Sequence, residues 1–230
     1  LVNFSRDLLR THLNEAGLAE KKLSVFKKVS EEQLLNYLTD TNYLLEGRQC
    51  CDFIQSDGIN DLVCKIFDFK EKDSVIDLGS GLGSFISYAS KNYEGVFFNG
   101  IEINKEIFII SNILLELNEV TGNLINDDIF NFEPAEKYNG VFSLPPFQGK
   151  TDFGIYETQI ESRLGEKTKR LEIGVVLKAL DMVSDDGKAI FCLPQGMLFS
   201  NGHEKLLRKY LIENKYVEAV IEMPSGTFYP

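Results

Sequence analysis

Three glycines at alternate positions, Gly79, Gly81 and Gly83, follow a short apolar run at residues 74–78. Glycine allows a tight turn in which the backbone can approach a ligand closely, and the residues that follow predict the N-terminus of a helix. Asp77 lies just before this turn, and Glu102 lies at the end of the next apolar run. A carboxylate at the end of the second strand of such a unit can accept hydrogen bonds from both ribose hydroxyls of a nucleotide-like ligand.

The spacing of the glycines argues against a dinucleotide site. The pattern is Gly-x-Gly-x-Gly, and Ser84 stands where a dinucleotide-binding loop would have its third glycine. The carboxylate of Asp77 would repel a pyrophosphate, whereas it would attract the ammonium group of a methionine moiety. A purely structural glycine turn is the alternative interpretation.

These residues resemble the first two motifs of S-adenosylmethionine-dependent methyltransferases. Residues 126–130 (Asn-Asp-Asp-Ile-Phe) resemble the third motif, whose acid contacts the adenine ring of the cofactor. Asp128 fits that position better than Asp127, although Asp128 as a simple turn residue remains an alternative. The resemblance implies that S-adenosylmethionine is the cofactor and that it is held by Asp77, Gly79, Gly81, Gly83, Glu102 and Asp128.

The segment 140–147 resembles the catalytic motif of amino-methyltransferases, Asn-Pro-Pro-Phe or Asp-Pro-Pro-Tyr. In this chain the four catalytic positions are Leu144, Pro145, Pro146 and Phe147. The two prolines hold the loop rigid and direct a backbone carbonyl at the substrate amine, and the aromatic ring stacks on a flipped-out base. Leu144 departs from the motif because its side chain accepts no hydrogen bond. The adjacent Ser143 is expected to point in the opposite direction to Leu144, because side chains alternate along an extended backbone.

From residue 57 onward the sequence alternates between apolar strand patterns and helix patterns. Strands are predicted at residues 74–78, 96–101, 123–125, 140–143, 188–193 and 217–221, and helices at 59–67, 85–92, 105–117, 171–183 and 204–213. This alternation predicts an α/β fold with a doubly wound, mostly parallel sheet, here of the S-adenosylmethionine-dependent methyltransferase type. Residues 1–50 are expected to form a small helical N-terminal segment. Residues 51–230 are expected to form the methyltransferase domain without its last, seventh strand.

The stretches at 187–199, 204–211, 217–221 and 224–228 are similar to the modification subunit of type I restriction-modification systems, within the N6-adenine DNA methyltransferase family. The resemblance implies methyl transfer to adenine N6 in DNA, with DNA reached through a specificity subunit and with a possible restriction subunit as a further partner. Two alternatives remain. A catalytically silent homologue would act as a scaffold or regulatory subunit, and the same Pro-Pro motif also serves methylation of RNA or protein.

The composition limits the other possibilities. The chain has 230 residues and a net charge of −11, so it is not expected to bind nucleic acid on its own. The densest basic cluster lies at residues 163–170, within a long connection (148–170) that is expected to be a mobile loop. Four cysteines and two histidines form no metal-ligand pattern, and no apolar run reaches the length of a membrane span. The expected location is the cytoplasm, with no metal and no membrane contact.

Overall fold

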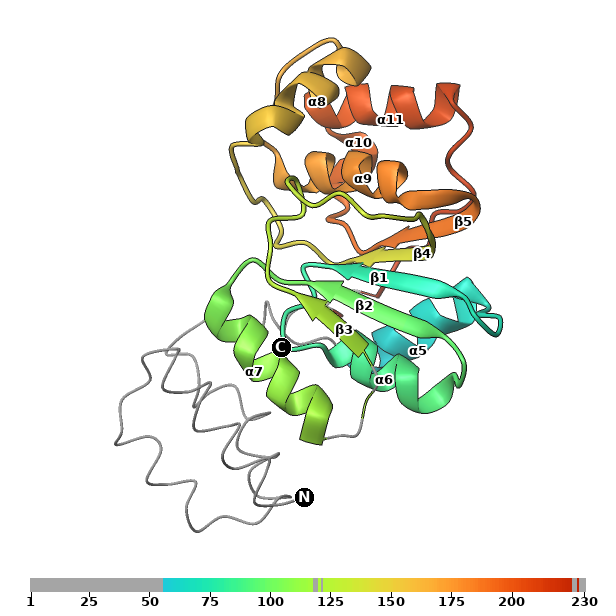
Figure 1. The fold of residues 1–230 in the computed structure, drawn as a ribbon. Coiled ribbons are helices and arrows are strands. Elements are labelled where there is room, and N and C mark those ends of the chain that lie inside the picture. Colours follow the sequence, from blue (N-terminus) through green and yellow to red (C-terminus); the bar gives the residue numbers. More distant parts are fainter. Residues whose placement is uncertain (1–55, 118–119, 121, 225–226, 228–230) are drawn as a thin grey trace.

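The computed structural model describes residues 56–117, 120, 122–224 and 227. The helical segment expected at residues 1–50 lies outside the described residues. Figure 1 shows a central sheet with helices packed above and below it.

Five parallel strands form the sheet, in the order β3-β2-β1-β4-β5. They are β1 (Ser74–Leu78), β2 (Phe97–Ile101), β3 (Gly122–Ile125), β4 (Tyr138–Ser143) and β5 (Val183–Phe191). The chain starts in the middle of the sheet, runs outward to β3, and then returns to the other side of β1. The carboxyl ends of β1 and β4 therefore lie side by side, where ligands bind in open parallel sheets.

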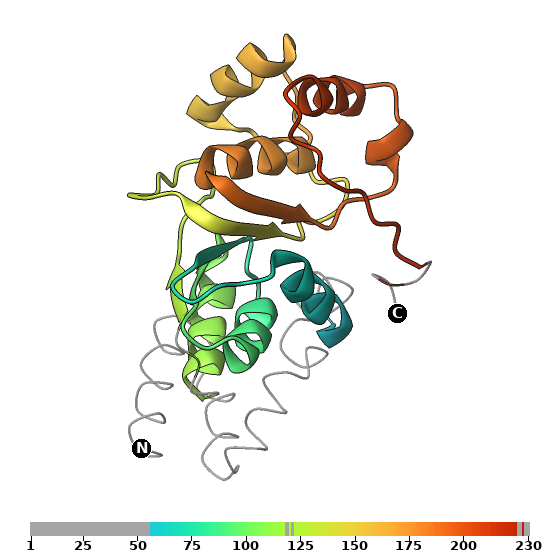
Figure 2. The ribbon, with the colours of Figure 1, turned by 90° about the vertical axis from the view of Figure 1, so that its right-hand side faces the viewer.

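The helices form two layers, one on each face of the sheet (Figures 1 and 2). One layer contains α5 (Asp57–Phe67), α6 (Ser84–Asn92) and α7 (Lys105–Leu117); the other contains α8 (Glu157–Leu164), α9 (Leu171–Met182) and α11 (His203–Glu213), with the short α10 (Gly196–Phe199) before α11. The doubly wound α/β fold predicted from the sequence is confirmed.

Each helical layer has an apolar core against the sheet. On the α5–α6 side, Phe85 and Phe142 are fully buried with ring centroids 4.7 Å apart, and both belong to a cluster that also contains Ile59 and Ile86. On the other side, apolar residues of α9 pack against β1, β2 and β4, and a further cluster joins α8, α9 and α11. Burial of these side chains supplies most of the driving force that fixes the strand ends in place.

The segment 148–170 is not the loop that the sequence predicted, whereas its mobility stays a prediction. It contains a 3-10 turn (Gly154–Tyr156) and the helix α8, whose Ile160 and Leu164 are buried in the cluster with Phe153 and Tyr156. These four side chains repeat every three or four residues, which is the spacing of one helix face. Their burial against α9 gives the segment its structure.

The strand predicted at residues 217–221 is also wrong. These residues form no ladder with the described strands, and Val217, Val220 and Ile221 are about half exposed. An apolar, β-branched stretch becomes a strand only when a neighbouring strand pairs with its backbone, and none of the described strands does so here. The described sheet thus has five strands, against the six that were counted from the sequence.

No described helix is both long enough and apolar enough to cross a membrane.

Candidate functional site

The glycine turn lies between β1 and α6, at the carboxyl edge of the sheet. Gly79, Gly81 and Gly83 all have positive φ angles, of 80°, 54° and 75°, which side chains with a Cβ rarely adopt. The N–H groups of Gly79 and Ser80 donate to the carbonyl of Ile101 at 3.0 and 2.9 Å, so the turn is fastened to the end of β2. The glycines are therefore required by the backbone conformation, as the sequence predicted.

A fourth glycine, Gly100 in β2, lets the turn lie close to the sheet. A Cβ added at Gly100 would lie 2.7 Å from Leu124 Cδ2, 2.8 Å from Ile86 Cδ1 and 2.8 Å from Ser80 Cβ. All three neighbours are packed side chains, so there is no room for even a methyl group. This position was not singled out from the sequence, where a glycine inside a strand gives only a weak signal of close approach.

Glu102 connects the end of β2 with the glycine turn. Its side chain is 5% exposed, and its two carboxylate oxygens accept from the N–H of Gly81 at 3.0 Å and from the N–H of Asn104 at 2.7 Å. Burial raises the pKa of Glu102, and these backbone hydrogen bonds act against that rise. The structure thus brings Glu102 and the turn together, and each oxygen keeps a lone pair for a ligand hydroxyl.

Asp77 lies under the same turn but has no partner among the described residues. It is 1% exposed, and neither carboxylate oxygen makes a hydrogen bond. Burial, with a smaller contribution from Glu102, raises the pKa of Asp77 to about 8. Burial, and then the nearby Asp77, raises the pKa of Cys192 to about 11. A buried acid without a donor is costly, which points to a ligand group that supplies the missing donors.

Two further polar side chains at the turn each have a buried atom without a hydrogen-bond partner among the described residues. Asn60 donates from Nδ2 to the carbonyl of Ser84 at 3.4 Å, while its Oδ1 atom is buried and unpaired. Ser80, within the turn, has an unpaired buried hydroxyl. Together with Asp77 they offer acceptors to a donor-rich ligand group, so the residues present fit the amino-acid end of S-adenosylmethionine. Sequence analysis missed Asn60 and Ser80 because unsatisfied polar atoms are visible only after folding.

Asp128 lies in the turn after β3. Its Oδ1 atom accepts from the N–H of Phe130 at 2.9 Å, so the carboxylate stabilises this turn. Asn126 donates from Nδ2 to the carbonyl of Glu102 at 2.7 Å, which holds the end of β3 against the end of β2. The turn role that was left open for Asp128 is therefore present. Contact with a cofactor stays a prediction.

The Leu-Pro-Pro-Phe segment begins where β4 ends, directly beside β1. Ser143 is fully buried and donates to the carbonyl of Leu78 at 2.6 Å, so its hydroxyl is bonded to the end of β1. Leu144 is partly buried and packs against the apolar cluster of the α5–α6 side. Pro145 is buried, whereas Pro146 is exposed and Phe147 is half-buried. The segment thus emerges next to the glycine turn.

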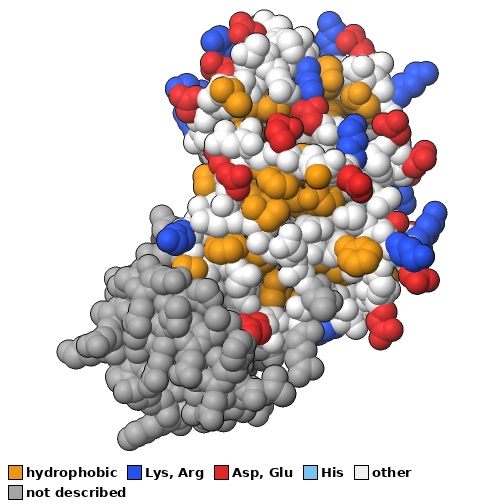
Figure 3. All heavy atoms as spheres, in the orientation of Figure 1, with side chains coloured by type: hydrophobic (Ala, Val, Ile, Leu, Met, Phe, Trp, Pro, Cys, Tyr) orange, Lys and Arg blue, Asp and Glu red, His pale blue; other side chains and the backbone are white. Residues whose placement is uncertain are grey.

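The basic cluster at 163–170 is largely neutralised within the fold. Arg163 pairs with Asp181 and also donates to the carbonyl of Leu177 at 3.1 Å. Lys167 pairs with two glutamates of α8, and Arg170 pairs with Glu204 at 2.9 Å. On the face drawn in Figure 3, acidic and basic side chains are interspersed among the coloured residues. The cluster therefore serves mainly to fasten α8 and α9 rather than to present free charge.

The fold and the glycine turn define the class of protein, an α/β domain of the S-adenosylmethionine-dependent methyltransferase type. A family model described as N-6 DNA methylase matches residues 31–230. This match takes in most of the chain, so the chain belongs to the N-6 DNA methylase family.

Curated relatives are of the same kind. The chain is 28% identical over 210 residues to the type I restriction enzyme MpnII methylase subunit of Mycoplasma pneumoniae, covering 79% of this chain and 38% of that protein. It is 24% identical over 181 residues to the type I restriction enzyme EcoEI methylase subunit of Escherichia coli, covering 71% and 36%. It is 27% identical over 264 aligned positions to the type II restriction enzyme and methyltransferase RM.BcgI of Heyndrickxia coagulans, covering 99% and 39%. The chain thus spans well under half the length of these relatives.

Solved structures agree on the fold. A Listeria monocytogenes protein described as a class I S-adenosylmethionine-dependent methyltransferase superposes with a TM-score of 0.66 at 14% identity, covering 84% of this chain and 64% of that one. An S-adenosylmethionine-dependent O-methyltransferase of Thermotoga maritima gives a TM-score of 0.52 at 14% identity, covering 76% and 55%.

Proposed function

We propose that the full-length protein transfers a methyl group from S-adenosylmethionine to N6 of adenine in DNA, as the modification subunit of a restriction-modification system. The observation that carries this proposal is the junction of β1 and β4. Three features meet there at one edge of the sheet: the glycine turn, Glu102 with its hydrogen bond from Gly81, and the Leu-Pro-Pro-Phe segment. Membership of the N-6 DNA methylase family supports it.

Each part of the site has a role in this reaction. The turn at Gly79, Gly81 and Gly83 would face the amino-acid end of the cofactor, together with Asp77. Glu102 would accept hydrogen bonds from the ribose hydroxyls, and Asp128 would contact the adenine ring. Bound S-adenosylmethionine supplies an electrophilic methyl group on a sulfonium.

The Leu-Pro-Pro-Phe segment would position the target base. The carbonyl of Pro145 would orient the exocyclic amine, and Phe147 would stack on a flipped-out adenine. Proximity and orientation would provide most of the rate acceleration, since an in-line transfer requires alignment of the amine with the methyl group. Pro146 helps to fix the backbone of this loop.

The partners follow from the relatives. Two of them are named as methylase subunits of type I restriction enzymes, so we propose that a specificity subunit brings DNA to this chain and that a restriction subunit completes the complex. The net charge of −11 supports a division in which target recognition lies elsewhere. The proposed location is the cytoplasm, where DNA and these subunits would meet.

One observation favours a second candidate function, that of a catalytically silent scaffold or regulatory subunit. Leu144 stands at the motif position where an asparagine or aspartate would accept a hydrogen bond from the amine. It packs against an apolar cluster together with Cys192 and Met223. A site without that acceptor is expected to lose on the order of 10²–10³ in rate, by analogy with other single polar catalytic groups.

The test is a methylation assay on the full-length protein with its partner subunits. DNA is incubated with isotope-labelled S-adenosylmethionine, digested to nucleosides, and analysed for labelled N6-methyladenine by mass spectrometry. We expect slow methylation by the wild type and a higher rate for Leu144→Asn. Leu198→Asn, at an exposed position in α10, is the matched control and should leave the rate unchanged.

The outcomes separate the two candidates. Cofactor binding without any methylation in wild type or Leu144→Asn would favour the silent homologue. Fast wild-type methylation with no gain in Leu144→Asn would show that another group accepts the hydrogen bond.

A further inference from the structure

Asp77 carries a charge problem that the proposed reaction does not explain. Its carboxyl group is buried and lacks a hydrogen-bond partner on either oxygen. An ionised carboxylate in such a place has no donor among the described residues to stabilise it. The neutral acid is much cheaper to bury, so the protonation state of Asp77 depends on what occupies the site.

The groups that face Asp77 explain why the negative charge of an ionised Asp77 would not be compensated. From the end of β2, Glu102 presents a second carboxyl group, whose charge is already supported by two backbone N–H groups. After β5, Cys192 presents a thiol whose pKa is raised. The register partner of Asp77 in β4 is Phe142, which is apolar, and no described cation contributes to the pKa of Asp77.

Two of the neighbouring polar groups cannot supply the missing charge either. Ser80 in the turn and Asn60 in α5 are neutral, and each has an unpaired buried atom of its own. Among the described residues, the turn therefore has beside it one supported carboxylate, one unsupported carboxyl group and two neutral side chains. None of these described groups carries a positive charge that would allow the second carboxyl group to ionise.

We propose that Asp77 is uncharged in the ligand-free protein and releases its proton to solvent when a cationic ligand binds over the glycine turn. This inference rests on the proposed function, because the cation that the site would receive is the ammonium group of S-adenosylmethionine or of its demethylated product. The ammonium supplies both donors and positive charge. The O–H bond of the Asp77 acid breaks, the proton goes to the buffer, and an ammonium–carboxylate pair remains.

The consequence is a binding affinity that depends on pH. If one proton leaves for each ligand bound, the dissociation constant falls about tenfold for each unit of pH while the acid is protonated in the free protein. The dependence levels off near pH 8, where Asp77 ionises in the free protein as well. Measurements between pH 6 and 7 avoid titration of the ligand's own α-amino group, which ionises near pH 7.7–8.0 as a rough reference range.

The experiment is calorimetric titration of the full-length protein with S-adenosylhomocysteine, which keeps the ammonium group and is chemically stable. Titrations at pH 6.5 are made in phosphate and in imidazole buffer, which have different ionisation enthalpies. The difference between the two binding heats, divided by the difference between the two ionisation enthalpies, gives the number of protons exchanged. We expect about one proton released by the wild type. Asp77→Asn, which has nearly the same shape as the neutral acid, should bind with release near zero.

Glu102→Gln is the matched control, since it removes the neighbouring carboxylate and leaves Asp77 in place. It should bind more weakly and still release a proton. Binding by the wild type with no proton release, or continued release by Asp77→Asn, would overturn the inference and leave the proposed function standing. Absence of binding by the wild type would instead overturn the cofactor assignment, and the inference with it.

Discussion

Replacing Asp77 by asparagine is expected to stabilise the ligand-free protein at neutral pH. The carboxyl group is fully buried, and burial raises its pKa to about 8 from an ordinary value of 3.8. The folded protein therefore holds the proton more tightly than the unfolded chain does. Such a group costs almost nothing well below its ordinary pKa of 3.8, where both states are protonated. Its cost grows as the pH rises, because the unfolded chain ionises while the folded protein does not.

The size of the effect follows from the two pKa values. Each unit of difference corresponds to about 1.36 kcal/mol, so between pH 4.5 and 7.5 the wild type should lose about 4 kcal/mol of stability through Asp77 alone. The loss should level off above pH 8, where both states are ionised. This is a large share of the ~5–15 kcal/mol that holds a typical domain together. In Asp77→Asn the loss should be absent.

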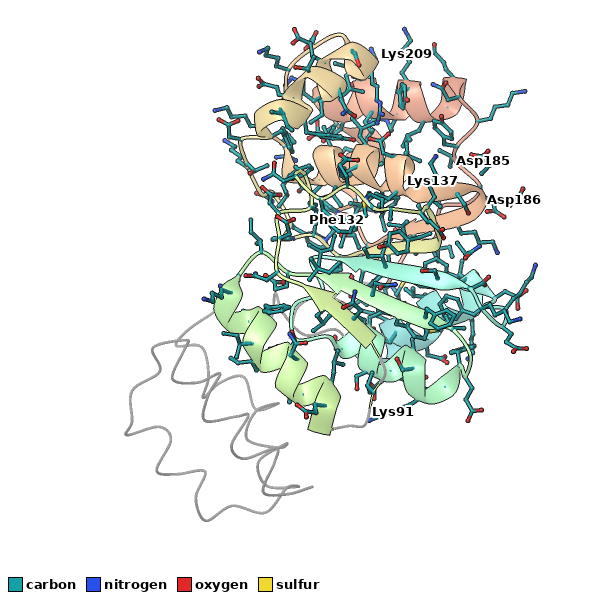
Figure 4. All side chains as sticks on the ribbon, in the orientation of Figure 1. Lys91, Phe132, Lys137, Asp185, Asp186 and Lys209 are labelled. Atoms are coloured by element: carbon teal, nitrogen blue, oxygen red, sulfur yellow. The ribbon has the colours of Figure 1, made fainter. Side chains whose placement is uncertain are left out.

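The assay is urea unfolding of both proteins at several pH values in this range, without ligand. Comparing the two proteins cancels the other groups that titrate, so the difference in unfolding free energy isolates Asp77. Asp186→Asn is the control for charge. Asp186 lies on the exposed part of β5 and points away from the sheet in Figure 4, so its removal should shift the curve little. Parallel curves for wild type and Asp77→Asn would refute the reasoning.

Three other tests, two of them with a control substitution, examine the packing and the site. Gly100→Ala should lower the unfolding free energy by about 1–3 kcal/mol in urea titrations, because its methyl group overlaps three packed side chains, whereas Gly58→Ala in open space on α5 should be neutral or stabilising. Arg163→Ala should lower the free energy of unfolding by about 1–3 kcal/mol and speed hydrogen exchange in α8. Lys167→Ala, which removes an exposed ion pair, should lower the free energy of unfolding by less than ~1 kcal/mol. Glu102→Ala should weaken cofactor binding by about 1.5–3 kcal/mol in calorimetry, and an unchanged affinity would remove Glu102 from the site.

Much of the sheet could be predicted because its strands are short apolar runs between turn residues. The bounds of β1 and α7 agree with the sequence-based prediction, and β2, β3 and β4 differ from it by one or two residues. The start of β5 was missed. Its first part contains Asp185, Asp186 and Gly187, which resemble a turn, and the pairing with β4 shifts register there. The extra residues at such a register shift depend on how the two strands pair, so they give no periodic pattern in the sequence.

The prediction for residues 217–221 failed for a different reason. Their β-branched and apolar residues favour an extended backbone, but a strand also requires a neighbour that accepts and donates its hydrogen bonds. For α8 the sequence does contain a signal, because the spacing of Phe153, Tyr156, Ile160 and Leu164 indicates a helix face. The length of the connection 148–170 and its basic cluster favoured a loop instead.

The candidate site shows the same division between local and tertiary information. Asp77 and Glu102 could be placed together because parallel strands end at one edge, which depends only on strand order. Asn60 could not be found, since its importance lies in one atom left without a partner after α5 packs beside the glycine turn. Nor could the sequence reveal that the carboxylate of Asp77 is without a donor. Position along the chain predicts proximity, whereas satisfaction of polar atoms depends on the packed fold.

The charges of the described residues also separate cofactor binding from DNA binding. The site has two buried carboxyl groups, which suit a cationic ligand and would repel phosphate when they are ionised. In the basic cluster at residues 163–170, Arg163, Lys167 and Arg170 form ion pairs with Asp181, Glu157 and Glu204 respectively. A phosphate that competed for Arg163 or Arg170 would have to break a pair that fastens α8 or α9. Binding of the DNA backbone, and its dependence on salt, should therefore come mainly from cations outside this site, as the proposed division of roles with a specificity subunit requires.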